Sequence, residues 1–369
     1  MKSMINFLGI IAIAAIIGFT FAACDTGASP GGGNETTTPA PGESVDNPVT
    51  LVITKDLGDF SVGSGWYVLL QEIEAAGLYV NLDLSAATMT GTEFNPIPAI
   101  NTGKNKIVSI TLPDVALSIP YIRWSASAFQ YFDKLQSVSG ASIITIGSGA
   151  FHHKTSLTSV NFPSVLTIGL DAFLGTTGLT SVSFPSVSTI DGAAFAGSGL
   201  TSITFPASAN INWENPFAGT SINTFTLTGS GSLSVIQNGR ALVRNNTELI
   251  AYPTASGNIT LENITSLLNF AFFYNHTLTG ANFPAVTHIS HGAFWGNQNL
   301  TSISLPAVTH IGNRAFYQSD NISEITIAAN VMNIGGWHSA RIYDFITHYN
   351  SQGQAAGTYT FVSGAWTGP

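Results

Sequence analysis

The chain of 369 residues contains little charge. Asp, Glu, Lys and Arg together make up 8% of it, whereas about a quarter is usual for a soluble domain. The balance is acidic, with a formal net charge of −9, which disfavours nucleic acid or an anionic lipid surface as a partner. Ser, Thr, Asn and Gly must therefore supply much of the surface that contacts water.

Cysteine is almost absent, because Cys24 is the only one in the sequence. No disulfide can form within a single chain, so stability must come from the burial of apolar side chains. A hydrophobic content of 44%, of which 11% is aromatic, supplies enough apolar material for that burial.

Recognisable catalytic and metal-binding motifs are also missing. The eight histidines form no HExxH or Cys/His zinc pattern, and no GxSxG sequence accompanies a matching His and Asp. The acidic residues follow no shared spacing that would pair a general acid with a base; among them are Asp171, Asp191, Glu262 and Glu324. The sequence therefore predicts a protein that is not an enzyme and that has neither a cofactor nor a metal site.

A block of about 22 residues repeats along the chain, with its clearest copies starting at Leu157, Leu179 and Leu300. A unit this short cannot bury its own apolar side chains, so the copies must stack into a solenoid. One phenylalanine recurs at the 22-residue step as Phe129, Phe151, Phe173, Phe195 and Phe217, and after an interruption the same step resumes with Phe272, Phe294 and Phe316. These rings are expected to form a ladder along the core.

Within one repeat, apolar Leu157, Val160 and Phe162 alternate with polar residues, which predicts a short strand with one buried face. A proline such as Pro163 ends the strand. A second apolar pair, Val165 and Ile168, then leads through a glycine turn to the Ala-Phe step. The predicted fold class is a mainly β repeat solenoid.

The LxxVxFP…TIG…AF pattern resembles the BspA-like, or treponemal-type, leucine-rich repeats over about residues 105–340. The resemblance implies a bacterial surface or secreted protein that mediates attachment and protein binding, without catalytic repeat residues. The segment 235–253 interrupts the repeats and is similar to a recurrent insertion of that family. Turn residues at Asn238-Gly239 and Asn245-Asn246 predict a β-hairpin there, near residues 233–253.

The first 23 residues resemble a bacterial lipoprotein signal peptide, with Lys2 followed by an apolar run and small residues before Cys24. By this resemblance Cys24 carries the lipid and anchors the protein to a membrane. An ordinary signal peptide and an amino-terminal membrane helix are the alternatives. Residues 24–47 have the Gly, Ser, Thr and Pro content of a flexible tether.

Segments outside the repeats are expected to cap the two ends, because an open solenoid end would expose apolar side chains and a strand edge. Residues 48–104 form the amino-terminal cap, with a helix over Gly65–Gly77 and a strand over Leu78–Ser85. Residues 341–369 form the carboxy-terminal cap, with a helix and then a hairpin through Tyr359, Phe361 and Trp366.

Two rows of side chains are candidates for binding. The first consists of polar residues exposed on the strands: Ser159, Asn161, Ser181, Ser183, Ser202, Thr204, Asn282, Ser302 and Ser304. Their small hydroxyls and amides make a weak protein site, since hot spots usually need Trp, Tyr or Arg, and strand propensity and solubility alone can explain them.

The second row follows the core phenylalanine in three successive repeats, as Phe273, Trp295 and Tyr317. If the core ring points inward, these three side chains should form one outward stripe on the convex side. Such a stripe could bind a protein or stack on sugar rings. Alternatively, the insertion or the carboxy-terminal cap covers them. His288 and His310 also share a repeat position, where we expect a solvated ladder rather than a metal site.

The function predicted from these features is that of a lipid-anchored leucine-rich repeat protein of the bacterial cell envelope, at the outer surface or the periplasmic face. It would act as a monomer in adhesion, with a protein or glycan ligand. A structural spacer lipoprotein without a specific ligand is the first alternative. A polysaccharide-active β-solenoid enzyme is the second, and it would need acidic or basic residues clustered on successive coils.

Overall fold

The computed structural model describes residues 39–97, 100–122, 127–212, 214–336 and 339–369. Cys24, the signal segment and the first part of the predicted tether lie outside these residues. The chain divides into two compact units, the first made of residues up to Leu166 with Thr176–Leu179, and the second of Thr167–Gly175 with Thr180–Pro369.

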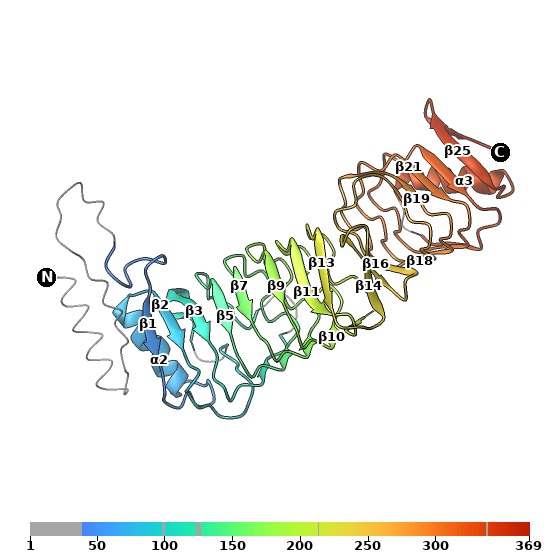
Figure 1. Cartoon of the computed structure of the whole chain (residues 1–369). Helices are drawn as coiled ribbons and strands as arrows, with labels where there is room; N and C mark the ends of the chain where they lie inside the picture. The colour runs from blue at the N-terminus through green and yellow to red at the C-terminus, as the bar shows by residue number, and fades with distance from the viewer. Residues whose placement is uncertain (1–38, 98–99, 123–126, 213, 337–338) are drawn as a thin grey trace, which may run out of the picture. The chain divides into compact units, whose positions relative to one another are not determined.

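Unit 1 is built on a sheet of parallel strands, in the order β1 (Val49–Val52), β2 (Val80–Asp83), β3 (Ile107–Thr111), β5 (Ser137–Ser139) and β7 (Ser159–Asn161) (Figure 1). A second, narrower row pairs β4 (Ser118–Ile119) with β6 (Thr145–Ile146). A short 3-10 helix, η1 (Lys104–Lys106), precedes β3. The cap strands β1 and β2 therefore continue the repeat sheet instead of forming a separate layer.

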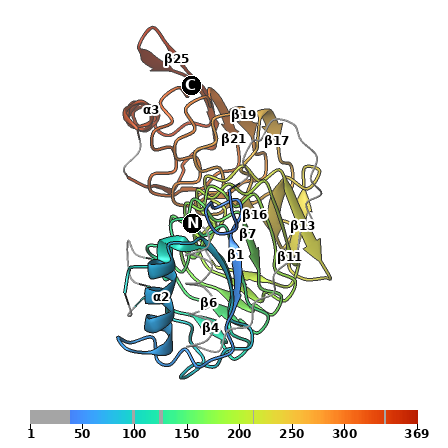
Figure 2. The same ribbon diagram turned by 90° about the vertical axis from the view of Figure 1, so that its left-hand side faces the viewer.

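The predicted cap helix is α2 (Gly65–Ala76), which runs beside the first strands of unit 1 (Figure 2). The Ser64 hydroxyl accepts a hydrogen bond from the Tyr67 N–H at its start, and left-handed Gly77 ends it. The cap also includes the end of the segment predicted as tether, since the Tyr79 N–H donates to the Gly42 carbonyl at 2.8 Å.

Unit 2 begins with two rows of parallel strands. The longer strands are β9 (Ser181–Ser183), β11 (Ser202–Pro206) and β13 (Thr224–Thr228). The two-residue strands are β8 (Thr167–Ile168), β10 (Thr189–Ile190) and β12 (Asn210–Ile211). Because one 22-residue step separates paired residues such as Ile168 and Ile190, the same repeat position stacks on itself.

The predicted insertion is an antiparallel meander of three strands, β14 (Leu233–Ile236), β15 (Ala241–Arg244) and β16 (Glu248–Ala251). Residues 237 and 238 and residues 245 and 246 take positive φ in its two turns, as the Asn-rich turn sequences predict. The third strand was not expected. It pairs in parallel with β18 (Ser266–Leu267), and so starts a new row of short strands.

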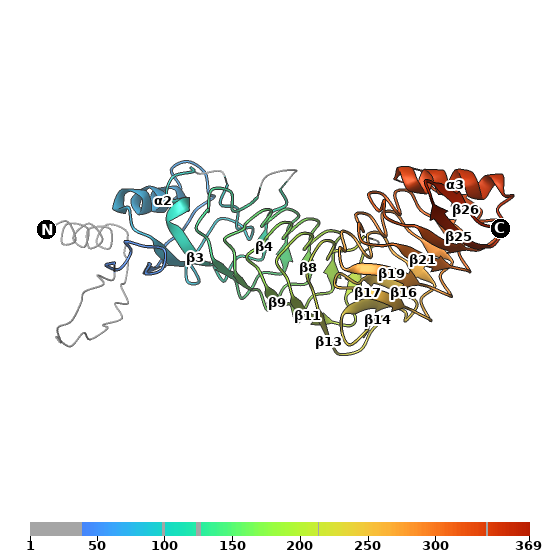
Figure 3. The same cartoon turned by 90° about the horizontal axis from the view of Figure 1, so that it is seen from above.

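Beyond the insertion, regular repeats resume. The longer strands are β17 (Gly257–Thr260), β19 (Leu278–Asn282), β21 (Ser302–Leu305) and β23 (Glu324–Ile327). The short ones are β20 (His288–Ile289), β22 (His310–Ile311) and β24 (Asn333–Ile334). The helix α3 (Ala340–Ser351) and the hairpin β25 (Gly357–Val362) and β26 (Ala365–Thr367) close this end (Figure 3).

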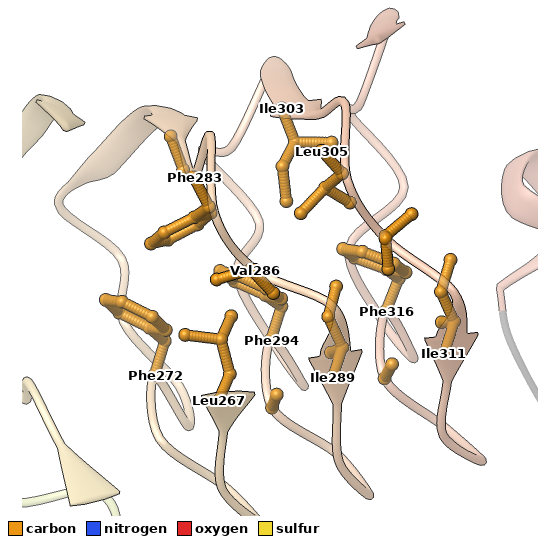
Figure 4. Close-up of a cluster of buried hydrophobic side chains, with 14 of the residues drawn as sticks. Leu267, Phe272, Phe283, Val286, Ile289, Phe294, Ile303, Leu305, Ile311 and Phe316 are labelled. Atoms are coloured by element: carbon orange, nitrogen blue, oxygen red, sulfur yellow. The ribbon is translucent and has the colours of Figure 1, made fainter. Parts of the chain in front are cut away.

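The phenylalanine ladder is present in both units. Phe129 and Phe151 stack in unit 1 with centroids 4.8 Å apart. In unit 2, Phe294 stacks between Phe272 and Phe316 at 5.0 and 5.3 Å, with ring planes within 5° of parallel (Figure 4). All eight ladder rings are buried. The prediction of one repeated core role for these residues is confirmed.

Candidate functional site

The polar row on the strands lies in register, as expected for stacked copies. Ser181 pairs with Ser202 and Ser183 with Thr204, while Asn282 pairs with Ser304. In unit 1, Ser159 and Asn161 are exposed. The side chains of Ser202, Thr204, Asn282, Ser302 and Ser304 are half-buried. This hydroxyl ladder is regular and uncharged, and it contains no large side chain that could anchor a partner.

The three aromatic residues that follow the core phenylalanine meet in unit 2. Trp295 packs edge-to-face with Tyr317 at 4.9 Å and with Phe273 at 5.8 Å between ring centroids. All three are half-buried rather than fully exposed or fully covered. Part of this burial comes from Phe270, which lies 5.3 Å from Phe273 and 6.2 Å from Trp295.

Tyr274 belongs to the same cluster, although the sequence pattern did not single it out. Its ring packs edge-to-face with Phe273 at 4.7 Å, and its side chain is 41% exposed. Its hydroxyl donates to Oε1 of Gln318, two repeats further on, at 2.9 Å. Trp295 Nε1 donates to the same oxygen at 3.1 Å. One amide therefore fixes the orientation of two aromatic rings, and we call Phe273, Tyr274, Trp295, Tyr317 and Gln318 the aromatic platform.

Backbone strain accompanies this arrangement. Tyr274 and Gln318 adopt left-handed φ values of 51° and 57°, at a repeat position where glycine stands in other copies as Gly175, Gly197, Gly219 and Gly296. A side chain in this conformation costs about 1 kcal/mol or more. Unit 1 has similar exceptions at Tyr131 and His153. The signal that could have revealed Tyr274 and Gln318 is thus a large residue at a glycine position.

A row of buried polar side chains holds the turns that carry the platform. The Asn297 side-chain amide donates to the Phe272 carbonyl at 2.7 Å, and the Ser319 hydroxyl donates to the Phe294 carbonyl at 2.6 Å. Asn275 Oδ1 accepts from the backbone N–H groups of Thr277 and Leu278. These bonds satisfy buried backbone groups and keep the platform turns in one conformation.

Two basic side chains lie beside the platform. The Arg314 guanidinium lies over the Trp295 ring, 5.5 Å from its centroid. The His291 ring packs edge-to-face on Phe270 at 5.2 Å. Burial, and then the nearby Arg314 charge, lower the pKa of His291. Both effects favour the neutral imidazole, so Arg314 is the charged group of the two.

The two histidines at one repeat position are stacked, with centroids 4.6 Å apart and planes 7° from parallel. The Thr287 and Thr309 hydroxyls bond to Nδ1 of His288 and His310 at 2.8 and 2.9 Å. In the described part of the chain, no group of three or more His, Cys, Asp or Glu side chains is arranged to hold a metal ion. This pair forms a short imidazole ladder.

Carboxylates come closer together than their spacing in the sequence indicates. Burial, and then the charge of Asp171, raise the pKa of Glu214, a residue that sequence reasoning did not consider. Burial also raises the pKa of Asp191, although the amide of Asn212 donates to that carboxylate. The spacing of the acids did not reveal this, because Asp171, Asp191 and Glu214 stand two, four and three residues before the core phenylalanine of their own repeats.

Parallel coils with a phenylalanine ladder define a solenoid of the leucine-rich repeat class. The BspA type leucine rich repeat region, in six copies, matches residues 104–240 and 254–339, together more than half of the chain. The protein belongs to this family. The unmatched residues 241–253 fall within the strand meander. No curated protein sequence matches the chain significantly.

Solved structures share the fold at low sequence identity. A leucine-rich cell surface protein of Faecalibacterium prausnitzii is 20% identical with a TM-score of 0.53, and the match covers 69% of this chain and 75% of that one. The pneumococcal vaccine antigen PcpA is 22% identical with a TM-score of 0.51, covering 68% and 64%. A leucine-rich repeat protein of Eubacterium ventriosum is 23% identical with a TM-score of 0.54, covering 62% of each chain.

Proposed function

We propose that this protein is a non-catalytic, lipid-anchored surface protein of a bacterial envelope that binds an external macromolecule through the aromatic platform of unit 2. The observation that carries the proposal is the convergence of Tyr274 and Trp295 on Gln318. Trp and Tyr are the residue types that dominate binding hot spots. Here their orientation is set before any ligand arrives, which lowers the entropy cost of binding.

Family membership and the descriptions of two similar structures support an envelope location. Those proteins are described as a cell surface protein and as a vaccine antigen. The acidic net charge and the low content of Lys and Arg disfavour nucleic acid as the ligand. No helix within the described residues is long and apolar enough to cross a membrane. The proposed anchor is a lipid on Cys24, and its support is the resemblance of the first 23 residues to a lipoprotein signal peptide.

The platform is tested by capture from host-cell and envelope extracts on immobilised protein. Trp295→Ala should reduce capture at least tenfold, because truncating a hot-spot residue costs about 2 kcal/mol or more. Ser302→Ala, on the hydroxyl ladder, serves as the matched control and should leave capture unchanged. Equal capture by the wild type and the Trp295→Ala variant, with both folded by circular dichroism, would contradict the platform as the binding surface. Absence of any specific capture would favour a structural spacer.

Lipid anchoring is tested separately at Cys24. Cys24→Ser removes the thiol to which a diacylglycerol would be attached, so the variant should move from the detergent phase to the aqueous phase, or remain as an unprocessed precursor. Phase partitioning and the mass of the mature amino terminus measure this. A processed Cys24→Ser protein that still partitions with detergent would show that lipid at this cysteine is not the anchor.

A further inference from the structure

The ring of Tyr274 lies flat on the backbone of the next repeat. A Cβ atom added to Gly296 would stand 3.0, 3.0 and 3.2 Å from three neighbouring ring atoms of Tyr274. Nearly equal distances to three atoms of a ring mean that the ring presents its face, not its edge. Gly296, at φ +77°, thus provides the space in which Tyr274 rests. Gly296 covers one face of the ring. Phe273 and His276 also pack against the ring edge-to-face, at 4.7 and 5.9 Å between centroids, and Tyr274 is still 41% exposed.

The hydrogen-bonding groups at the rim of the Tyr274 ring are its own hydroxyl and the side-chain amide of Gln318. Gln318 Oε1 accepts two hydrogen bonds, from Tyr274 and Trp295, which occupies both of its lone pairs. The two N–H donors of the same amide then have no partner among the described residues, and Gln318 is exposed. The Tyr274 hydroxyl donates its one hydrogen bond to Gln318, so it offers only acceptor lone pairs to a ligand. The rim therefore presents two donors and one acceptor beside a flat apolar face.

We propose that the platform binds a neutral glycan, with the apolar face of a pyranose ring on Tyr274 and two adjacent sugar hydroxyls on Gln318 and the Tyr274 oxygen. This inference rests on the proposed function and names its ligand class. A pyranose has C–H groups on one face and hydroxyls at its edge, which each donate and accept, so it matches both features at once. Of the two basic side chains beside the platform, His291 has a lowered pKa, and the Arg314 guanidinium lies over the Trp295 ring, 5.5 Å from its centroid.

Affinity for one sugar unit should be weak. A monosaccharide has about a dozen non-hydrogen atoms, which at the usual ligand efficiency gives a dissociation constant on the order of 1 mM. Binding to a glycan-covered surface would be stronger, since many anchored copies engage at once and each further contact becomes intramolecular. An anchored protein on an envelope is suited to this multivalent mode.

The test uses saturation-transfer NMR on the full solenoid with cellobiose, maltotriose, chitobiose and lactose as probes. We expect at least one probe to receive saturation at its ring C–H protons, with a dissociation constant in the millimolar range. Tyr274→Gly removes the aromatic ring and should weaken glycan binding at least tenfold. Glycine stands at this position in other repeats and adopts a positive φ without strain, so the melting temperature should not fall. Tyr274→Phe keeps the ring but loses the hydroxyl, and should bind several-fold more weakly.

Tyr131→Gly is the matched control, since Tyr131 also has a positive φ, is 43% exposed and lies in unit 1. It should leave glycan binding unchanged. No saturation transfer to any probe, or binding that survives Tyr274→Gly, would overturn the glycan inference. If glycans do not bind but Trp295→Ala still abolishes capture from extracts, the ligand is a protein and the proposed function stands. If neither glycan binding nor capture depends on the platform, the proposed function itself is wrong.

Discussion

Phe294→Ala is expected to lower the free energy of unfolding of unit 2 by about 3–5 kcal/mol, the usual loss for a buried phenylalanine. Phe294 is fully buried and lies between two parallel rings and against Phe283, at 5.0, 5.3 and 5.9 Å (Figure 4). Removing the ring leaves a cavity that the neighbouring rings cannot fill, because each of them is held in place by its own repeat. Two stacking contacts are lost together with the buried area.

Chemical denaturation of the wild type and the variant measures the effect. Repeat arrays can unfold in parts, so tryptophan fluorescence and far-ultraviolet circular dichroism should be recorded together. Met332→Ala is the control, since this side chain is 73% exposed and should change stability by no more than about 0.5 kcal/mol. A loss below about 1 kcal/mol for Phe294→Ala would mean that the ladder does not carry the core.

Lys104→Met is expected to stabilise unit 1 at neutral pH. Lys104 is only 1% exposed, and its Nζ lies 3.4 Å from the Ile97 carbonyl oxygen and 5.9 Å from the centroid of the Phe132 ring. Within the described residues it forms no ion pair. Burial therefore lowers its pKa from 10.5 to about 8. Replacing it by Met keeps the length of the side chain and removes the buried charge.

The direction of the pH effect follows from the lowered pKa. Below about pH 8 the lysine is protonated in both the folded and the unfolded chain, and the folded state carries the whole cost of burying the ammonium. Between pH 8 and 10.5 the folded chain has lost this proton while the unfolded chain still holds it. Stability therefore rises with pH through that window, by up to about 3 kcal/mol.

Thermal and urea unfolding at pH 7, 8.5 and 10 measure this dependence. The Lys104→Met variant should be up to about 3 kcal/mol more stable than the wild type at pH 7, and its stability should lack the rise between pH 8 and 10. Lys55→Met, at an exposed position on the same cap, should keep that rise and alter stability by no more than about 0.5 kcal/mol. Identical pH profiles for the Lys104→Met variant and the wild type would contradict the assignment.

Local pattern and periodicity were enough to predict the solenoid, the ladder and the position of the insertion. These features are local or strictly periodic. A phenylalanine that recurs every 22 residues must take one role, and a proline or an Asn-Gly pair fixes its turn through its own backbone. The cap helix was predictable for the same reason, since the apolar spacing of 65–76 and Gly77 lie within a single element.

The side chains that make the candidate site could be recognised only once the repeats were stacked in the fold. Tyr274 and Gln318 stand 44 residues apart and meet across Gly296, so neither the spacing of the aromatic stripe nor its composition revealed the bond between them. Half-burial of the stripe depends on Phe270, which occupies a turn position where other repeats have different residues. Likewise, Lys104 is buried only because the cap packs around it. Stacking fixes which repeat positions are neighbours, but contacts that cross a repeat depend on the individual side chains.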